Sequence, residues 1–258
     1  MAEKFAINTQ DLTKYYGKLR AVHNLNLKIP PGQTYGLLGP NGAGKTTSVK
    51  MLNSIITPSS GEAQVLGYNI KTQKHQVKLN CGFLTETPSL YEKLTAREFL
   101  EFVGDLYQVP KKKLNNRIEV FLKLFELKSR ENNLLQGYSR GMKQKICLSA
   151  TLIHDPEILF LDEPTANLDP ISARIVKDII IDLAKKGNKT LFICTHLLDI
   201  AKELCDVIGI MNNGTIMIEG SPKEVIDSVN ARSLEDAYLK ILTPSQKDRQ
   251  KKDYLSWR

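Results

Sequence analysis

The sequence lacks any apolar run that approaches the roughly 18 residues needed to cross a bilayer. Its first residues, Met1-Ala2-Glu3-Lys4, also lack the basic and then apolar pattern of a signal peptide. Of the 258 residues, 41% are hydrophobic and 25% charged, enough to bury the core of one large domain or of one domain with an inserted subdomain. These features favour a soluble globular protein, for which any work at a membrane needs another chain to span it.

Cysteine is sparse and unpaired in sequence. The chain has four cysteines and no CxxC spacing, and each cysteine sits within an apolar segment. The pattern excludes a disulfide framework and argues against a metal site built from these residues. We expect reduced core thiols in a cytosolic setting at Cys81, Cys147, Cys194 and Cys205.

Positive charge exceeds negative, with a net charge of +8, but the excess is concentrated in two stretches. From Lys111 to Arg130 seven Lys or Arg oppose two Glu, and from Pro244 to Arg258 five oppose two Asp. Such stretches suit nucleic acid or an anionic membrane surface. We interpret them instead as solvated helix faces and a basic tail, and we expect no nucleic acid partner.

The first third of the chain alternates β-like runs with turns, and we expect strands over Leu25 to Ile29 and Thr34 to Leu38, with a helix from Lys45 to Asn53. Further apolar runs, each bounded by helical patterns, are typical of strands buried on both faces of an α/β core. These runs are Cys81 to Leu84, Ile158 to Leu161 and Leu191 to Cys194.

Between Glu86 and Tyr138 the β signals vanish and helical patterns replace them. Thr95 to Glu98 forms a capping box, followed by one apolar face at Phe99, Phe102, Val103 and Leu106. We therefore expect an inserted helical subdomain. Further along, Asn213-Gly214 between two apolar runs predicts a tight hairpin turn.

One glycine-rich loop carries a specific phosphate-binding signal. Gly39 to Thr46 reads GPNGAGKT and fits GxxxxGK[ST] between a β-like run and a helix. The glycines let backbone N–H groups reach phosphate oxygens, Lys45 pairs with the β and γ phosphates, and the Thr46 hydroxyl can bind Mg²⁺. This loop predicts a site for ATP and Mg²⁺.

Two adjacent carboxylates follow the apolar run that starts at Ile158. Asp162 is suited to hold Mg²⁺ through water, and Glu163 can polarise the attacking water in phosphoryl transfer. His196 follows the run from Leu191 to Thr195 and would open onto the same edge, where its imidazole could fix the water beside the γ-phosphate.

A second phosphate-binding surface precedes another helical pattern. Ser139 and the N–H of Gly141 would lie at a helix N-terminus, roughly 20 residues before the acidic pair. By itself this segment is better explained as a helix cap, because a single phosphate loop needs no second phosphate-binding surface.

Along the chain, these motifs follow one another in the order found in the nucleotide-binding domain of ABC transporters, and the sequence resembles that domain from about Phe5 to Gly220. The resemblance implies catalytic roles for Lys45, Glu163 and His196, and Mg²⁺ ligation by Thr46, Glu86 and Asp162. It also places Glu86 in the Q-loop and identifies Ala166 to Asp169 as the D-loop. The implied nucleotide-binding residues are Tyr16, Gly39, Pro40, Asn41, Gly42, Ala43, Gly44, Lys45, Thr46, Thr47, Ser139, Gly141 and Met142.

The sequence departs from the usual motifs of this family at two places. Arg140 and Met142 alter the usual Leu-Ser-Gly-Gly-Gln signature, and Glu86 stands where Gln is usual, which adds negative charge near the metal. Both resemble ATPase subunits of the ABC-2 export type. About forty residues follow Gly220, whereas sugar importers usually carry a larger β-rich domain there, so export is favoured.

The resemblance implies a P-loop NTPase α/β fold with a mostly parallel sheet, an N-terminal antiparallel β subdomain and an inserted α-helical subdomain. The ATPase domain would span 1–230, with the insert at about 87–150, and a short helix and basic tail would occupy 231–258. A second copy or a paralogous ATPase subunit would join head to tail, with each ATP between one phosphate loop and the other chain's signature.

The same resemblance implies a polytopic ABC-2-type membrane subunit as partner, which would hold the chain peripherally on the cytoplasmic side of the cell membrane. We expect a short helix of that subunit to dock in a groove lined by Pro88 to Leu94 and the helix from Thr95. Exposed aromatics such as Tyr91 or Phe99 would anchor it, and the Lys111 to Arg130 stretch would face acidic residues or lipid headgroups. For Phe99 the alternative, a residue of the core, is at least as well supported.

Two rival functions fit the sequence less well. A GTPase needs Asn-Lys-x-Asp for guanine, and the nearest run, Asn188 to Leu191, lacks the acid. A non-transport ABC ATPase acting on nucleic acid or ribosomes usually carries two cassettes or a long coiled-coil insertion. One phosphate loop and short insert helices favour the transporter instead.

Overall fold

A computed structural model describes residues 5–165, 168–185 and 189–243 of the chain. At its centre lies a six-stranded sheet of order β11-β10-β4-β9-β8-β7, in which every neighbouring pair is parallel except β10 and β11. The strands are β4 (Thr34–Leu38), β7 (Cys81–Leu84), β8 (Ile158–Asp162), β9 (Thr190–Thr195), β10 (Val207–Asn212) and β11 (Thr215–Gly220). The predicted mostly parallel α/β core is confirmed.

Three central strands, β4, β8 and β9, are buried at every residue, which explains their continuous apolar sequences. Because they run parallel, their carboxyl ends share one edge: Leu38 pairs with Thr195, and Asp162 pairs with Cys194. Ligands of open α/β sheets bind at this edge.

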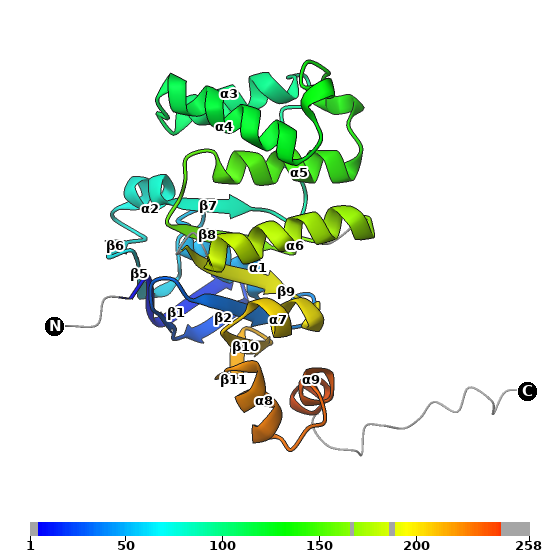
Figure 1. Ribbon diagram of the computed structural model, residues 1–258. Helices are drawn as coiled ribbons and strands as arrows, with labels where there is room; N and C mark the ends of the chain where they lie inside the picture. The colour runs from blue at the N-terminus through cyan, green and yellow to red at the C-terminus, as the bar shows by residue number, and fades with distance from the viewer. Residues whose placement is uncertain (1–4, 166–167, 186–188, 244–258) are drawn as a thin grey trace, which may run out of the picture.

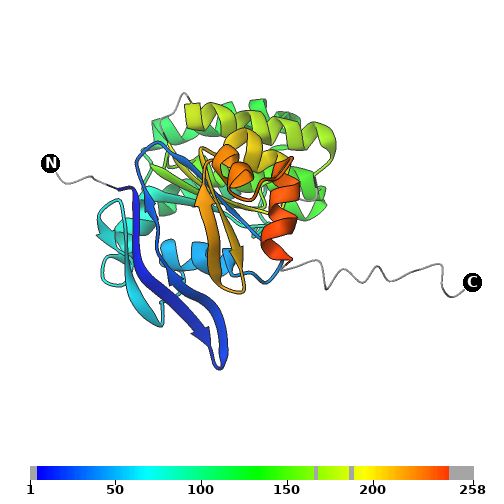
Figure 2. The same cartoon turned by 90° about the horizontal axis from the view of Figure 1, so that it is seen from below.

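A second, antiparallel sheet is built from the N-terminal third, as predicted. It has the order β2-β1-β5-β6, with β3 also paired to β1, and Figure 2 shows the long β1–β2 hairpin along one side of the molecule. Its strands are β1 (Ile7–Tyr16), β2 (Leu19–Leu25), β3 (Lys28–Ile29), β5 (Ser60–Val65) and β6 (Tyr68–Asn69).

The expected single strand from Leu25 to Ile29 is wrong, because the chain ends one strand at Leu25 and begins another at Lys28. The Thr9 hydroxyl occupies the gap: it donates to Leu25 O at 2.7 Å and accepts from Leu27 N at 2.8 Å. A buried side chain from β1 thus replaces strand hydrogen bonds that the alternating sequence had suggested.

Helices cover the faces and one end of the central sheet (Figure 1). Alongside the sheet lie α1 (Lys45–Leu52), α2 (Lys74–Asn80), α6 (Pro170–Lys185) and α7 (Leu198–Leu204), and after β11 come α8 (Pro222–Ser228) and α9 (Leu234–Leu242). The expected helix from Lys45 is thus confirmed. The basic tail from Pro244 lies outside the described residues.

The remaining helices stack at the end of the molecule opposite α8 and α9, and we call α3, α4 and α5 the helical layer (Figure 1). It comprises α3 (Ala96–Leu106), α4 (Lys111–Leu124), the short 3-10 turns η1 (Lys128–Arg130) and η2 (Leu135–Gly137), and α5 (Arg140–Leu152). The predicted capping box is present, since Thr95 accepts from Glu98 N and the Glu98 carboxylate accepts from Thr95 N. These bonds also lower the pKa of Glu98.

The predicted hairpin turn joins β10 to β11. Asn213 and Gly214 both adopt left-handed backbone angles, with φ of 46° and 82°. The turn touches two other elements: Gly214 N donates to Ala43 O, and His23 N donates to Gly214 O, each at 2.8 Å. It therefore ties β2 to the loop that follows β4.

All four cysteines are buried free thiols, as expected. Burial raises the pKa of the Cys147 thiol to about 12, so that it stays protonated at neutral pH. Within the described residues, no helix combines the length and apolar composition that crossing a bilayer would require.

Candidate active site

The glycine-rich loop joins the carboxyl end of β4 to the first turn of α1. Gly42 and Gly44 adopt left-handed angles, with φ of 81° and 110°. Gly39 and Gly44 are also crowded, since a Cβ atom would lie 2.3 Å from Met211 O on the first and 2.4 Å from Ala21 O on the second. Glycine is therefore required both for the turn and for the close approach of neighbouring chain segments.

Lys45, the first residue of α1, points back across this loop. Its Nζ atom donates to Gly39 O at 2.7 Å and to Pro40 O at 3.1 Å, and the side chain is buried. Gly39 and Pro40 thus hold the ammonium group. A positive charge beside free N–H groups at a helix N-terminus is a suitable cradle for phosphate oxygens.

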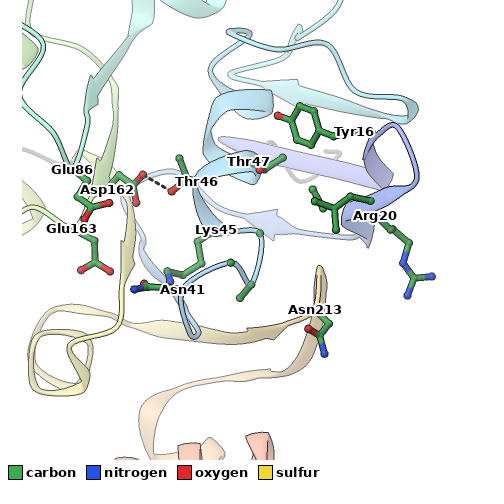
Figure 3. A pocket seen from close by; sticks show the side chains of 15 residues that line it. Tyr16, Arg20, Asn41, Lys45, Thr46, Thr47, Glu86, Asp162, Glu163 and Asn213 are labelled. Atoms are coloured by element: carbon green, nitrogen blue, oxygen red, sulfur yellow. Dashed lines mark hydrogen bonds between the residues drawn. The ribbon is translucent and has the colours of Figure 1, made fainter.

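The cradle opens into a pocket of about 630 Å³, the size of a small-ligand site. Figure 3 shows three groups of side chains along it: carboxylates at one end, Lys45, Thr46 and Thr47 in the middle, and Tyr16 and Arg20 at the other end. The sequence-predicted residues that line the pocket are Tyr16, Asn41, Gly42, Ala43, Gly44, Lys45, Thr46, Thr47, Glu86, Asp162 and Glu163.

The carboxylate end contains the expected metal ligands. Thr46 Oγ1 donates to Asp162 Oδ2 at 2.7 Å, and Glu86 lines the same wall. Burial raises the pKa of Asp162, and the nearby charges of Glu163 and Glu86 raise it further. A hydroxyl and two carboxylates that repel one another form an oxygen donor set that fits Mg²⁺. Bound there, the ion would neutralise phosphate and carboxylate charge.

Glu163 is held in one orientation by the end of β9. Its Oε1 atom accepts the main-chain N–H of His196 at 3.0 Å and lies 2.7 Å from His196 Nδ1, while Oε2 accepts from Thr195 Oγ1 at 2.9 Å. Glu163 is buried, whereas the His196 side chain is half exposed. The structure thus brings together the two residues that the sequence assigned to the attacking water.

Sequence reasoning missed several residues of this site. Thr195 was overlooked because a Thr at a strand end carries no motif signal, although it lies directly before His196. Arg20 and Asn213 were missed because the pocket reaches them only through long-range contacts of β2 and of the β10–β11 turn. The unpredicted lining residues are Leu19, Arg20, Ala21 and Asn213.

Two other predicted nucleotide contacts, Gly39 and Pro40, do not line the pocket but hold Lys45 beside it. The remaining ones lie elsewhere. Ser139, Gly141 and Met142 do not line the pocket but form the first turn of α5, where Ser139 Oγ accepts from Met142 N at 3.3 Å. A Cβ atom on Gly141 would lie 3.7 to 3.9 Å from Leu168, Asp169 and Ser172, so this turn faces the start of α6. Ala166 and Asn167 of the expected D-loop lie outside the described residues.

Taken together, a phosphate cradle, an Mg²⁺-compatible carboxylate pair and an oriented buried Glu suit hydrolysis of a nucleoside triphosphate. In that chemistry the protein mainly positions the reactants and neutralises charge, and these residues can do both.

Comparison with known proteins gives consistent matches. Residues 22–166 match the family model described as ABC transporter. The chain is 38% identical over 229 residues, 89% of its length, to the bacitracin transport ATP-binding protein BcrA of Bacillus licheniformis, of which it covers 74%.

Two solved structures share the architecture. One, an ATP-binding subunit of an ABC transporter, is 25% identical with a TM-score of 0.86 over 92% of this chain and 100% of that one. The other, cbiO1 from Clostridium perfringens, part of the transporter complex cbiONQ, is 26% identical with a TM-score of 0.74 over 92% and 99% of the two chains.

Proposed function

This chain belongs to the ABC transporter family as an ATPase that powers transport across a membrane, and we propose that it drives export with an ABC-2-type membrane subunit. Two sequence segments support export, Gly82 to Glu86 and Tyr138 to Met142, since both read like ABC-2 export ATPases. The relative BcrA is a bacitracin transport ATP-binding protein, which supports a role in transport.

In the proposed reaction, the loop from Gly39 to Thr47 binds the phosphates of ATP, and Tyr16 stacks on the adenine. Thr46, Asp162 and Glu86 would hold Mg²⁺. Glu163 accepts the proton of the attacking water, and His196, in contact with that carboxylate, keeps it aimed at the γ-phosphate. When ATP binds, the Lys45 ammonium group donates to phosphate oxygens in place of the carbonyls of Gly39 and Pro40.

The observation that carries the two-chain mechanism of this proposal is the position of α5. Its first turn, with Ser139 capped onto Met142 N, lies outside the pocket that contains Lys45 and Glu163. A second chain placed head to tail would bring this turn onto the bound nucleotide and complete two equivalent sites. ATP would close such a pair and hydrolysis would reopen it, which moves the membrane subunit between two states.

We infer that residues 1–230 form the ATPase domain, with the helical insert at about 87–150, and that the insert receives the membrane subunit on the cytoplasmic side. Tyr91 is 62% exposed and stacks edge-on with Phe102 at 5.3 Å, which suits an anchor. Of the two alternatives for Phe99, an exposed anchor or a core residue, the structure supports the core residue: Phe99 is 5% exposed, since its face of α3 packs against the core of the helical layer.

The basic stretch is partly neutralised in the chain itself. Lys111 pairs with Asp105, Arg117 pairs with Asp155, and Lys128 pairs with Glu119 and Glu131. Among its cations, Lys112 and Lys113 are exposed at the start of α4 and are the ones we expect near acidic groups or lipid headgroups.

Purification of the tagged full-length chain from its own cells, in mild detergent, tests the proposal. We expect a polytopic ABC-2-type protein to copurify in a nuclease-resistant complex, and a cysteine at Tyr91 to crosslink to it. RNA or ribosomal proteins in its place would support the rival non-transport function. Crosslinks obtained only from Asn213, at the opposite end of the domain, would contradict the docking face.

A further inference from the structure

One face of α5 follows the chain segment that leaves β7. Thr151 contacts the strand itself, since a Cβ atom on Gly82 would lie 2.6 Å from Thr151 O. One turn earlier, Cys147 lines the same small cavity as Ser89. One turn earlier again, Lys143 Nζ pairs with Glu92 Oε1 at 2.5 Å. Residues four apart lie on one face of a helix, so these contacts form a stripe.

This stripe connects the two halves of the proposed composite site. Its segment begins beside Glu86, which lines the ATP pocket, and its helix begins at Ser139, which would contact the ATP of the second chain. Figure 1 shows α5 between the central sheet and the α3–α4 pair, the position expected for a connecting element.

Glu92 also binds the chain just before α5. Its carbonyl accepts from Gln136 N, and the carbonyl of Leu94 accepts from Leu135 N, each at 2.9 Å. Gln136 lies just before Ser139, and Lys143 lies one turn after it. The main chain and the side chain of Glu92 therefore hold both sides of the α5 N-terminus.

We propose that the Glu92–Lys143 ion pair is a positioning contact that couples the Glu86 segment to Ser139 at the start of α5. The inference rests on the proposed two-chain site. When the Glu86 segment shifts, Glu92 shifts with it and draws the first turn of α5 towards or away from the second chain's ATP. The pair touches no nucleotide itself and acts only through Ser139.

The pair is well placed to affect position more than stability. The Glu92 side chain is 57% exposed, and exposed ion pairs contribute little to folding. If the pair breaks, the main-chain bonds from Gln136 and Leu135 and the buried stripe at Cys147 keep the fold in place.

Charge reversal in the full-length chain tests the proposal. We expect Glu92→Lys and Lys143→Glu each to lower the maximal ATP turnover about three- to fivefold, while the ATP affinity of the single chain stays within about twofold. The double variant, which restores the pair in reverse, should recover most of the loss. Lys143→Arg, which keeps the positive charge, should retain most of the wild-type turnover. The deficit of the single variants should shrink at about 1 M salt, because salt screens the charges.

A matched control is the Asp105–Lys111 pair, an exposed ion pair between α3 and α4 that lies outside the stripe. Reversal of Lys111 should leave turnover unchanged. The proposal is overturned if the Glu92 and Lys143 variants retain wild-type turnover, or if the double variant is no better than the single ones. The two-chain site, on which this proposal rests, is tested separately. It would be contradicted if the turnover per chain of the wild type did not rise with protein concentration.

Discussion

His196 and Glu163 are joined twice: the imidazole Nδ1 lies 2.7 Å from Glu163 Oε1, and the main-chain N–H of His196 donates to the same oxygen at 3.0 Å. The other carboxylate oxygen accepts from Thr195. Glu163 itself adopts a left-handed backbone angle, with φ of 49°, directly after the buried β8. Residues at the end of β9 therefore fix the direction of the Glu163 carboxylate, which directly follows β8.

Replacement of this carboxylate gives the first prediction. Glu163→Gln keeps the shape but cannot accept a proton from water, so ATP hydrolysis should fall on the order of 10²-fold or more while ATP affinity is retained. The variant should also trap an ATP-bound dimer, visible by size-exclusion chromatography. Wild-type turnover would remove Glu163 from the role of base and leave Asp162 or His196 to explain catalysis.

Thr195 gives the second prediction. Thr195→Val removes a hydroxyl that donates to Glu163 Oε2 and accepts from Leu197 N. With the carboxylate less firmly aimed, maximal turnover should fall about tenfold with little change in KM. Steady-state kinetics would show this as a change in kcat alone.

Thr190→Val is the matched control for that variant. Thr190 is a buried Thr at the other end of β9, and its hydroxyl accepts from Gly32 N at 2.9 Å. Both variants should lose about 1 kcal/mol of unfolding free energy, because each leaves an N–H without its partner. Only the Thr195 variant should lose turnover, and equal losses in both would assign its effect to stability.

Mg²⁺ dependence gives the third prediction. Asp162→Asn removes a charge beside Thr46 Oγ1, and the Mg²⁺ concentration for half-maximal hydrolysis should rise about tenfold or more. Glu86→Gln should give a smaller rise in the same titration. Asp105→Asn, far from the pocket on α3, should leave the titration unchanged, and an unchanged titration in Asp162→Asn would rule out Asp162 as part of the metal site.

The fourth prediction concerns pH and stability. His154 Nε2–H donates to Cys81 O at 3.1 Å and its ring stacks on Tyr107, with 3.7 Å between centroids. Burial lowers the pKa of His154 from 6.5 to about 4. The unfolded chain therefore takes up the proton first as pH falls below 6.5, and stability decreases down to about pH 4.

When the pH is lowered from about 7.5 to about 5, His154 should lower the free energy of unfolding by about 1 to 2 kcal/mol. Urea titrations at the two pH values measure this change. His154→Gln keeps a donor near Cys81 but cannot titrate, so its stability should depend less on pH in this range. His75, which is exposed, serves as control when changed to Gln. Equal pH dependence in wild type and His154→Gln would contradict the account.

Local sequence signals predicted those parts of the fold that depend on local chemistry. The capping box at Thr95 and the left-handed Asn213-Gly214 turn are set by neighbouring residues and were read correctly. The break after Leu25 was not, because the Thr9 hydroxyl that replaces the strand bonds comes from another strand. The sequence could not decide the buried face of α3 for the same reason, since Phe99 and Phe102 are both apolar and only packing decides which is buried.

The candidate site shows the same division. Motif spacing identified the loop from Gly39 and the pair Asp162 and Glu163, because phosphate and metal chemistry demand those residue types in sequence order. Arg20 and Asn213 reach the pocket through tertiary contacts of β2 and the β10–β11 turn, which no local pattern encodes.

Mixing two inactive variants tests the composite site most directly. Lys45→Ala should lose ATP binding, whereas Gly141→Asp should keep it and lose only hydrolysis that needs the second chain. In a head-to-tail hybrid, the phosphate loop of the Gly141→Asp chain meets the intact α5 N-terminus of the Lys45→Ala chain, which regenerates one complete site. An equal mixture should therefore hydrolyse ATP at up to about a quarter of the wild-type rate. A mixture no more active than its separate components, or Gly141→Asp protein that fails to bind ATP as severely as Lys45→Ala, would contradict the shared site.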